Sequence, residues 1–218
     1  MEALFAALLG YFCGSIPFGL LLTKAAGMGD VRDIGSGNIG ATNVLRTGNK
    51  GLAAGTLLLD LLKGIIPVFL AGLIWGFYDG HMHRHALDPF YGAPVDWPIY
   101  VSAEACAALG AILGHCFPVW LKFKGGKGVA TNAGVAFGLA FPIGLTYAFA
   151  WIATLAIFRI SSVAGMSAVV AAAAGAYFLD FAGFVPVLTI IALLIIYLHR
   201  ANISRLLKGE EPKVGGSK

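Results

Sequence analysis

Apolar runs long enough to cross a membrane alternate with short polar segments along most of the chain. A spanning helix needs about 20 apolar residues, so a run of about 30 is too long for one span. The run at 129–158 is of this longer kind, and Pro142 and Gly144 predict two short helices that meet near residues 141–144. We therefore predict an all-α integral membrane protein with seven transmembrane helices, some of them short or broken. The predicted spans are residues 3–23, 52–74, 99–121, two within 129–158, 163–179 and 184–198.

Composition supports this class. The 218 residues are 58% hydrophobic and 12% charged, whereas a soluble domain is nearer a quarter charged. We expect one polytopic membrane domain over residues 1–218. Glu2, with no basic residue before the first apolar run, is atypical of a cleaved signal peptide, so the first helix is expected to remain.

The positive charges are distributed very unevenly. Seven helices would place 13 of the 15 lysines and arginines on one side, with Lys63 inside the second helix and Arg84 on the other side. Such a bias marks the cytoplasmic side. We expect the N-terminus outside, the C-terminus in the cytoplasm, and the protein in the cell inner membrane. The cations are then topology signals and anion ligands, and no nucleic acid is expected as a partner.

The first polar stretch, residues 36–51, combines glycines, amides, hydroxyls and cations with no acidic residue. Glycine lets backbone N–H groups approach an anion, and the guanidinium of Arg46 can hold two phosphate oxygens. The alternative is a positively charged loop whose glycines only make turns, but its amides and hydroxyls are denser than topology requires. The other candidate phosphate ligands are Ser36, Gly37, Asn38, Thr42 and Asn43.

The second polar stretch, residues 114–132, ends in a glycine-rich turn that opens a predicted helix, as a phosphate cradle does. It is not a nucleotide P-loop, because Gly128 rather than Ser or Thr follows Lys127, and Leu121 replaces the leading glycine. A phosphate compound smaller than ATP is therefore favoured. The candidate ligands here are Lys122, Lys124, Gly125, Gly126, Lys127 and Gly128.

Two histidines end predicted spans. His115 and His199 could each act as a base or a phosphate ligand, or be an interfacial histidine without such a role. Asn202 would share a helical face with His199 if that helix continues. Asp60 and Lys63 are three residues apart inside a predicted span, and we expect them to pair in a structural role.

The predicted outer loop contains a motif that we set aside. His83 and Asp88 match a His-x4-Asp acyltransferase pattern, but two fixed positions are weak evidence and the loop faces away from the cations. His81, His83 and His85 could bind a metal, although a solvated loop is the preferred interpretation. No metal or other cofactor is expected.

Three segments closely resemble the cytoplasmic motifs of the bacterial acyl-phosphate:glycerol-3-phosphate acyltransferases. They are GSGNIGATNVLR from residue 35, GHCFPVWLKFKGGKGVAT from residue 114 and HRANISRLLKGEE from residue 199. The resemblance implies a seven-helix enzyme that acylates glycerol 3-phosphate from acyl phosphate, giving 1-acyl-glycerol 3-phosphate. It also implies catalytic roles for Ser36, Arg46, Lys127, His199 and Asn202, a substrate loop at Gly125, Gly126 and Gly128, and a structural role for Glu211.

The chemistry expected from this resemblance is direct transfer. A hydroxyl of glycerol 3-phosphate attacks the acyl carbonyl and inorganic phosphate leaves, with His199 or an oxygen of the donor phosphate as the base. Acyl phosphate, glycerol 3-phosphate and membrane lipid are the expected partners, without an obligatory protein partner. The alternative is a transporter of a phosphorylated solute, but the polar groups crowd one face and the two halves of the sequence differ.

Overall fold

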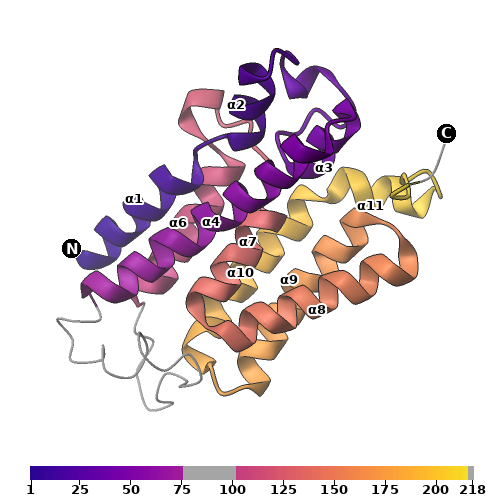
Figure 1. Ribbon diagram of the computed structural model, residues 1–218. Helices are drawn as coiled ribbons and strands as arrows, with labels where there is room; N and C mark the ends of the chain where they lie inside the picture. Colours follow the sequence, from indigo (N-terminus) through magenta and orange to yellow (C-terminus); the bar gives the residue numbers. More distant parts are fainter. Residues whose placement is uncertain (76–101, 216–218) are drawn as a thin grey trace.

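The computed structural model describes residues 1–75 and 102–215, and within these ranges every regular element is helical (Figure 1). Four short 3-10 turns accompany the α-helices: η1 (Val31–Asp33), η2 (Leu45–Thr47), η3 (Val119–Leu121) and η4 (Ala182–Phe184). The predicted outer loop, with His81, His83, Arg84, His85 and Asp88, lies outside the described residues, as does Ile99. The α-helices are α1 (Glu2–Gly14), α2 (Phe18–Ala25), α3 (Ala41–Val44), α4 (Lys50–Trp75), α6 (Ala103–Cys116), α7 (Val129–Leu139), α8 (Phe141–Phe158), α9 (Ser161–Phe178), α10 (Val185–Leu198) and α11 (Arg200–Leu207).

Five helical stretches of the described chain are long and apolar enough to cross a membrane. They are Glu2–Ala25, Lys50–Trp75, Ala103–Leu121, Phe141–Phe158 and Ser161–Phe178, and a sixth is the pair Ala182–Leu198 and Arg200–Leu207, bent by 57°. Large apolar side chains such as Phe149 and Phe178 are mostly exposed, as expected of surfaces that face lipid.

Two predicted helices are interrupted or end earlier than expected, in each case next to a proline. The first, predicted as continuous over residues 3–23, is interrupted between α1 and α2, where Pro17 precedes Phe18. The third, predicted to reach Leu121, leaves α-helical geometry after Cys116, immediately before Pro118. Proline lacks an N–H donor and disfavours a helical conformation in the residue before it. The break predicted within 129–158 is confirmed, and it lies at Ala140, between α7 and α8.

Close helix packing depends on small residues. A Cβ atom on Gly10 or Gly14 of α1 would lie 2.1 Å from a backbone oxygen of α6, and one on Gly110 or Gly114 of α6 would lie 2.2 or 2.1 Å from a backbone oxygen of α1. Such contacts let two helix backbones touch, which is how membrane helices associate when water gives no hydrophobic driving force.

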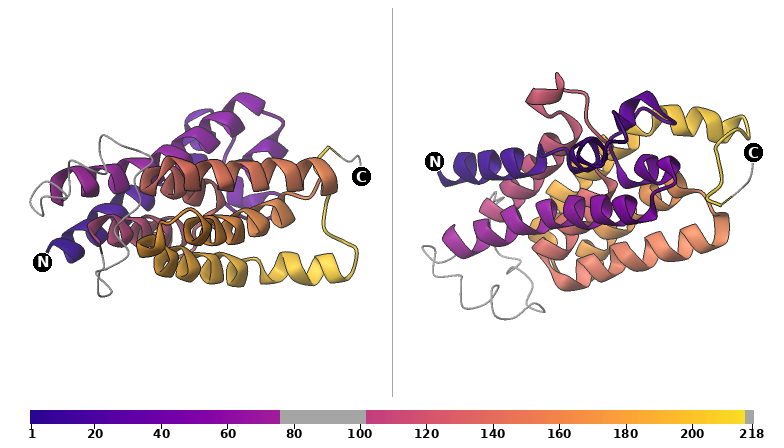
Figure 2. Two further views of the ribbon diagram at one scale, coloured as in Figure 1. Left: turned by 90° about the horizontal axis from the view of Figure 1, so that it is seen from below. Right: turned by 45° about the horizontal axis from the view of Figure 1, so that its top comes forward.

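The polar segments gather at one end of the molecule. Figure 1 shows α2, α3, the α6–α7 connection, the α8–α9 link and α11 at this end, with the N-terminus at the opposite end. Both views of Figure 2 also place the N-terminus and α11 far apart. Hydrogen bonds join these distant segments, including one of 2.6 Å from the Val214 N–H to the Arg159 carbonyl. The fold therefore brings segments from the whole chain to one place.

Asp60 and Lys63 form a buried ion pair inside α4. Nζ of Lys63 lies 2.7 Å from Oδ1 of Asp60 and donates a hydrogen bond of 2.8 Å to the carbonyl of Ile16, at the break between α1 and α2. The predicted pairing of these two residues is confirmed. The break frees this carbonyl from helical hydrogen bonding, so the lysine both neutralises the aspartate and fastens α4 to the interrupted helix.

Candidate active site

The loop between α2 and α4 is organised around the side chain of Asn43. Its Nδ2 donates hydrogen bonds to the carbonyls of Val31 at 2.7 Å and Asn38 at 2.8 Å. Its Oδ1 accepts from the backbone N–H of Ser36 at 2.9 Å and from Nη1 of Arg46 at 3.3 Å. Asn43 is 2% exposed, and its hydrogen bonds position Ser36 and Arg46.

The remaining candidates of this loop stay accessible. Nδ2 of Asn38 donates to Oγ of Ser36 at 3.2 Å, and Thr42 is exposed in α3. Gly37 adopts φ +69°, a left-handed conformation that side chains other than glycine disfavour. The hydroxyls of Ser36 and Thr42 and the side chain of Arg46 are thus exposed on this loop, and Asn38 is half-buried.

The glycine-rich turn is fastened to the end of α6. The backbone N–H of Gly125 donates to the carbonyl of Cys116 at 3.1 Å, and the backbone N–H of Gly126 donates to the carbonyl of His115 at 3.0 Å. These two amides are therefore engaged within the protein and do not form the cradle that the sequence suggested. Gly128, at φ +84°, begins α7. What this turn delivers to the site is the side chain of Lys127.

His115 lies beneath the glycine-rich turn. It is 3% exposed, and its Nδ1 shares a hydrogen bond of 3.0 Å with Oγ1 of Thr131 in the first turn of α7. Its Nδ1 also lies 3.9 Å from Oδ1 of Asp60. A side chain so enclosed supports the loop above it, so neither of the roles suggested by its position at a helix end, base or phosphate ligand, has a geometric basis.

The last predicted helix does not continue straight past His199. The chain bends by 57° between α10 and α11, and Nδ1 of His199 lies 2.7 Å from the carbonyl oxygen of Ile195. Because a carbonyl can only accept, Nδ1 carries the proton, and Nε2 of the neutral ring is left as an acceptor. The bend means that Asn202 is not presented on a straight continuation of the His199 face. Asn202 turns to a different partner.

That partner is Lys127. Nζ of Lys127 donates to Oδ1 of Asn202, whose Nδ2 donates to Oε1 of Glu211 at 2.5 Å. Glu211 also accepts from Ser162 at 2.7 Å and from Nε of Arg205 at 2.7 Å. Burial alone would raise the pKa of Glu211, but these hydrogen bonds outweigh it and hold the pKa below its ordinary value. The anchored carboxylate fixes the amide, and the amide fixes the lysine.

Cations outnumber carboxylates around Lys127. Burial lowers the pKa of Lys127, and the positive charges of Arg205, Arg46 and Arg200 lower it further, against the opposing charge of Glu211. Of these arginines, Arg46 belongs to the first polar motif and Arg200 and Arg205 belong to the third. Such an excess of positive charge is stabilised by a bound anion.

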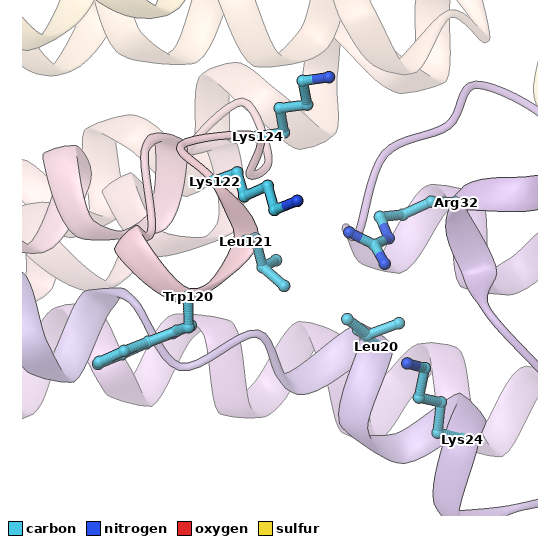
Figure 3. A pocket seen from close by; sticks show the side chains of 7 residues that line it. All are labelled: Leu20, Lys24, Arg32, Trp120, Leu121, Lys122 and Lys124. Atoms are coloured by element: carbon cyan, nitrogen blue, oxygen red, sulfur yellow. The ribbon is translucent and has the colours of Figure 1, made fainter.

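Lys122 and Lys124 lie elsewhere. They line a cleft of about 470 Å³ together with Leu20, Lys24 and Arg32, and are not among the charges that act on Lys127 (Figure 3). These two lysines thus line a cleft that includes none of the other candidate phosphate ligands. Sequence position alone could not show this, because Lys122 is only five residues from Lys127.

Two contributors were not identified from the sequence. Ser162, at the start of α9, and Arg205, in α11, both hold Glu211. The position of Arg205 six residues before Glu211 gave a weak local signal, whereas the contribution of Ser162 depends on tertiary packing. Within the described residues, no three His, Cys, Asp or Glu side chains are grouped as metal ligands would be.

A family model described as glycerol-3-phosphate acyltransferase matches residues 4–209. The chain belongs to this family. A glycerol-3-phosphate acyltransferase of Erythrobacter litoralis is 63% identical over 210 residues, covering 96% of this chain and 94% of the relative. One from Mesorhizobium japonicum is 51% identical, covering 96% of this chain and 95% of the relative.

Solved structures of the acyltransferase family match the fold as well. The crystal structure of PlsY, an integral membrane glycerol 3-phosphate acyltransferase, in its glycerol 3-phosphate form superposes with a TM-score of 0.81 at 34% identity. That match covers 99% of this chain and 96% of PlsY. The lysophosphatidic acid form of PlsY gives a TM-score of 0.79 at 33% identity, with the same coverage. The chain is thus an all-helical integral membrane protein of this acyltransferase family.

Proposed function

We propose that this protein transfers an acyl group from an acyl phosphate to glycerol 3-phosphate, releasing 1-acyl-glycerol 3-phosphate (lysophosphatidic acid) and inorganic phosphate. Family membership supports the acceptor, and PlsY structures carrying glycerol 3-phosphate and lysophosphatidic acid support the acceptor and product. The three motifs that resemble acyl-phosphate-dependent enzymes support the donor. This reaction is the entry to phospholipid synthesis.

One observation carries the proposal at the level of the site. Lys127 of the second motif is hydrogen-bonded to Asn202 of the third, and Asn202 is held by Glu211. The positive charge of Arg46 in the first motif acts on the same lysine and lowers its pKa. Lys127 is held by Asn202 rather than by a carboxylate, so its charge is oriented without being neutralised. This arrangement suits the transient binding of a phosphate dianion.

We assign the phosphate of glycerol 3-phosphate to Arg46 and Lys127, with Ser36 as a hydroxyl ligand. Asn38 and Thr42, accessible on the same loop, complete the polar surface. Asn43, His115, Asp60, Lys63 and Glu211 hold this surface in place. A substrate fixed by its phosphate presents a hydroxyl to the acyl donor at high effective concentration.

The transfer then needs no covalent enzyme intermediate. The hydroxyl oxygen forms a bond to the acyl carbon, and the bond from that carbon to the donor phosphate oxygen breaks, because phosphate is already a good leaving group. Cations at the site stabilise the charge that develops on this phosphate. Ser36 contacts Asn43 and Asn38 and has no adjacent base, so a nucleophilic role is not supported.

The hydroxyl proton passes to Nε2 of His199 or to an oxygen of the departing phosphate. The hydrogen bond from Nδ1 to Ile195 favours the histidine, because it fixes the tautomer that leaves Nε2 able to accept.

We further propose that the chain works as one polytopic unit of seven spans, with its N-terminus outside and its site facing the cytoplasm at the inner membrane. The supporting elements are the five long apolar stretches, the bent α10–α11 pair and the short apolar helix α7. Lysines and arginines concentrate in the segments at the α11 end, opposite the N-terminus.

The test is a phosphate-release assay on the purified full-length protein with palmitoyl phosphate and glycerol 3-phosphate. We expect phosphate release that requires both substrates and is lost in Arg46→Ala, while Lys213→Ala, an exposed cation of the same end, retains it. Palmitoyl-CoA in place of palmitoyl phosphate is expected to give no product. Transfer from the CoA donor alone would overturn the proposed donor, and absence of any transfer by folded protein would overturn the proposed reaction.

A further inference from the structure

A second cationic cleft lies beside α2, away from Lys127. Lys24 and Arg32 form one wall and Lys122 and Lys124 the other, and the side chain of Lys122 points across the gap toward Arg32 (Figure 3). Asp30 partly compensates the positive charge of the first wall. It accepts a hydrogen bond of 2.9 Å from Nε of Arg32 and lies 3.8 Å from Nζ of Lys24.

The opposite wall has no such compensation. In the part of the chain that the structure describes, neither Lys122 nor Lys124 has a carboxylate within 4.0 Å. The hydrogen bonds and charge of Arg32 hold the pKa of Asp30 well below its ordinary range. This carboxylate is therefore paired with the first wall. Two rows of like charge facing each other repel unless an anion lies between them.

Apolar and aromatic side chains also line the cleft, as expected of a site for a lipid. Leu20 and Leu121 line it, and so does Trp120, half of whose surface is exposed. The Trp120 indole N–H donates to the carbonyl of Ser15 at 2.6 Å, and its ring lies 6.3 Å from that of Phe12 on the apolar, outward face of α1. An indole fixed in this way, next to lysines, is typical of the membrane interface.

The backbone holds the second wall in place. Lys122 and Phe123 adopt φ values of 53° and 61°, and the N–H of Phe123 donates to the carbonyl of Pro118 at 3.0 Å. This tight turn leaves Phe123 60% exposed and sets Lys122 and Lys124 on either side of it. An exposed phenylalanine between two lysines fits a surface that meets acyl chains and headgroups together.

We propose that this cleft binds the headgroup of an acidic phospholipid of the surrounding membrane, with the phosphate between the two cationic walls and the acyl chains along Trp120 and Phe12. The site is independent of the proposed transfer reaction, since it uses none of the residues assigned to it. It would hold the α2 loop and the α6–α7 turn, which carry the two substrate motifs, against the bilayer surface. The lipid source is favoured over a soluble phosphate because the cleft opens beside an aromatic pair on the lipid-facing side.

Quenching of Trp120 fluorescence by brominated lipids tests this proposal. The full-length protein with Trp75, Trp97 and Trp151 changed to Phe is titrated in neutral detergent with phosphatidylglycerol brominated on its acyl chains. We expect saturable quenching by this lipid and much weaker quenching by brominated phosphatidylcholine. Lys122→Gln with Lys124→Gln should weaken the binding about 25-fold, since each lysine near a headgroup contributes about fivefold.

Lys208→Gln with Lys213→Gln is the matched control, because it removes the same charge from exposed positions outside the cleft. Equal effects of the two double variants, or equal quenching by both lipids, would overturn the proposal. Displacement of the acidic lipid by millimolar glycerol 3-phosphate or inorganic phosphate would instead assign the cleft to a soluble phosphate. Preservation of helical content in each variant shows that lost quenching reports binding and not unfolding.

Discussion

A Cβ atom placed on Gly126 would lie 2.1 Å from Nε2 of His115. The imidazole ring therefore lies directly against the backbone of the turn that carries Lys127, and the two residues are further joined by the hydrogen bond from the Gly126 N–H to the His115 carbonyl. Because the ring is buried against Thr131 and near Asp60, it cannot move aside for a larger residue. His115 thus fixes the position of the glycine-rich turn relative to α6 and, through the turn, the position of Lys127.

Gly126→Ala is expected to raise the KM for glycerol 3-phosphate more than tenfold and to lower stability by about 1–3 kcal/mol, the usual cost of overpacking. Phosphate release at varied glycerol 3-phosphate concentration and thermal unfolding measure the two effects. Gly51→Ala is the control, since its nearest neighbour, Oδ1 of Asn49, would be 3.4 Å away. Addition of His115→Ala to Gly126→Ala should restore part of the stability. A KM unchanged in Gly126→Ala would contradict this account of the turn.

Lys127 should limit activity on the basic side. Its pKa is lowered by burial and by the charges of Arg205, Arg46 and Arg200, so the ammonium is intact below that pKa and is lost at a lower pH than for an ordinary lysine. The KM for glycerol 3-phosphate is therefore expected to rise with pH already below the ordinary pKa of a lysine. Lys127→Arg should remove this rise, because arginine remains protonated. Coinciding pH profiles for the wild type and Lys127→Arg would show that another group is responsible.

His199→Asn tests the origin of the base. Asparagine can replace the donor to the Ile195 carbonyl but cannot accept a proton, so positioning is kept and basicity is lost. We expect kcat to fall by about 10²–10⁴, the usual contribution of general acid–base catalysis, with little change in KM. The measurement is phosphate release under saturating substrates. A fall of less than about tenfold would transfer the role to an oxygen of the donor phosphate.

The buried ion pair of α4 should be more sensitive to loss of one partner than of both. Lys63→Met leaves Asp60 without its cation and removes the side-chain donor to the Ile16 carbonyl, which keeps the N–H of Phe18 at 3.1 Å. We expect a loss of about 3–5 kcal/mol of stability. Asp60→Leu together with Lys63→Met should cost less than Lys63→Met alone, because no buried charge remains. Thermal unfolding in detergent compares these variants, with exposed Lys50→Met as the control. A double variant no more stable than Lys63→Met would argue against charge burial as the cause.

Several residues of the candidate site could be predicted from the sequence, but the role of each could not. Asn43 and Arg46 occur in the same polar motif, yet the amide is buried and the guanidinium is exposed, because only one face of the loop packs on the protein. Lys122 and Lys127 occur in the same short turn, yet Lys122 lines the cleft beside α2 whereas Lys127 donates a hydrogen bond to Asn202. Residue type and position in the motif do not decide these outcomes, because burial and direction depend on how each loop packs.

The membrane class, the break between α7 and α8, the Asp60–Lys63 pairing and the three motifs could be predicted from the amino-acid sequence, because hydropathy, proline and helical spacing act over a few residues. Which polar groups meet depends on how the helices pack. Asn202 accepts from Lys127, 75 residues away, because α10 bends at His199 and α6 ends before Pro118, and neither geometry is encoded in the residues that make the contact. Local chemistry provided the ligands, and the packing of helices around small residues determined where each of them lies.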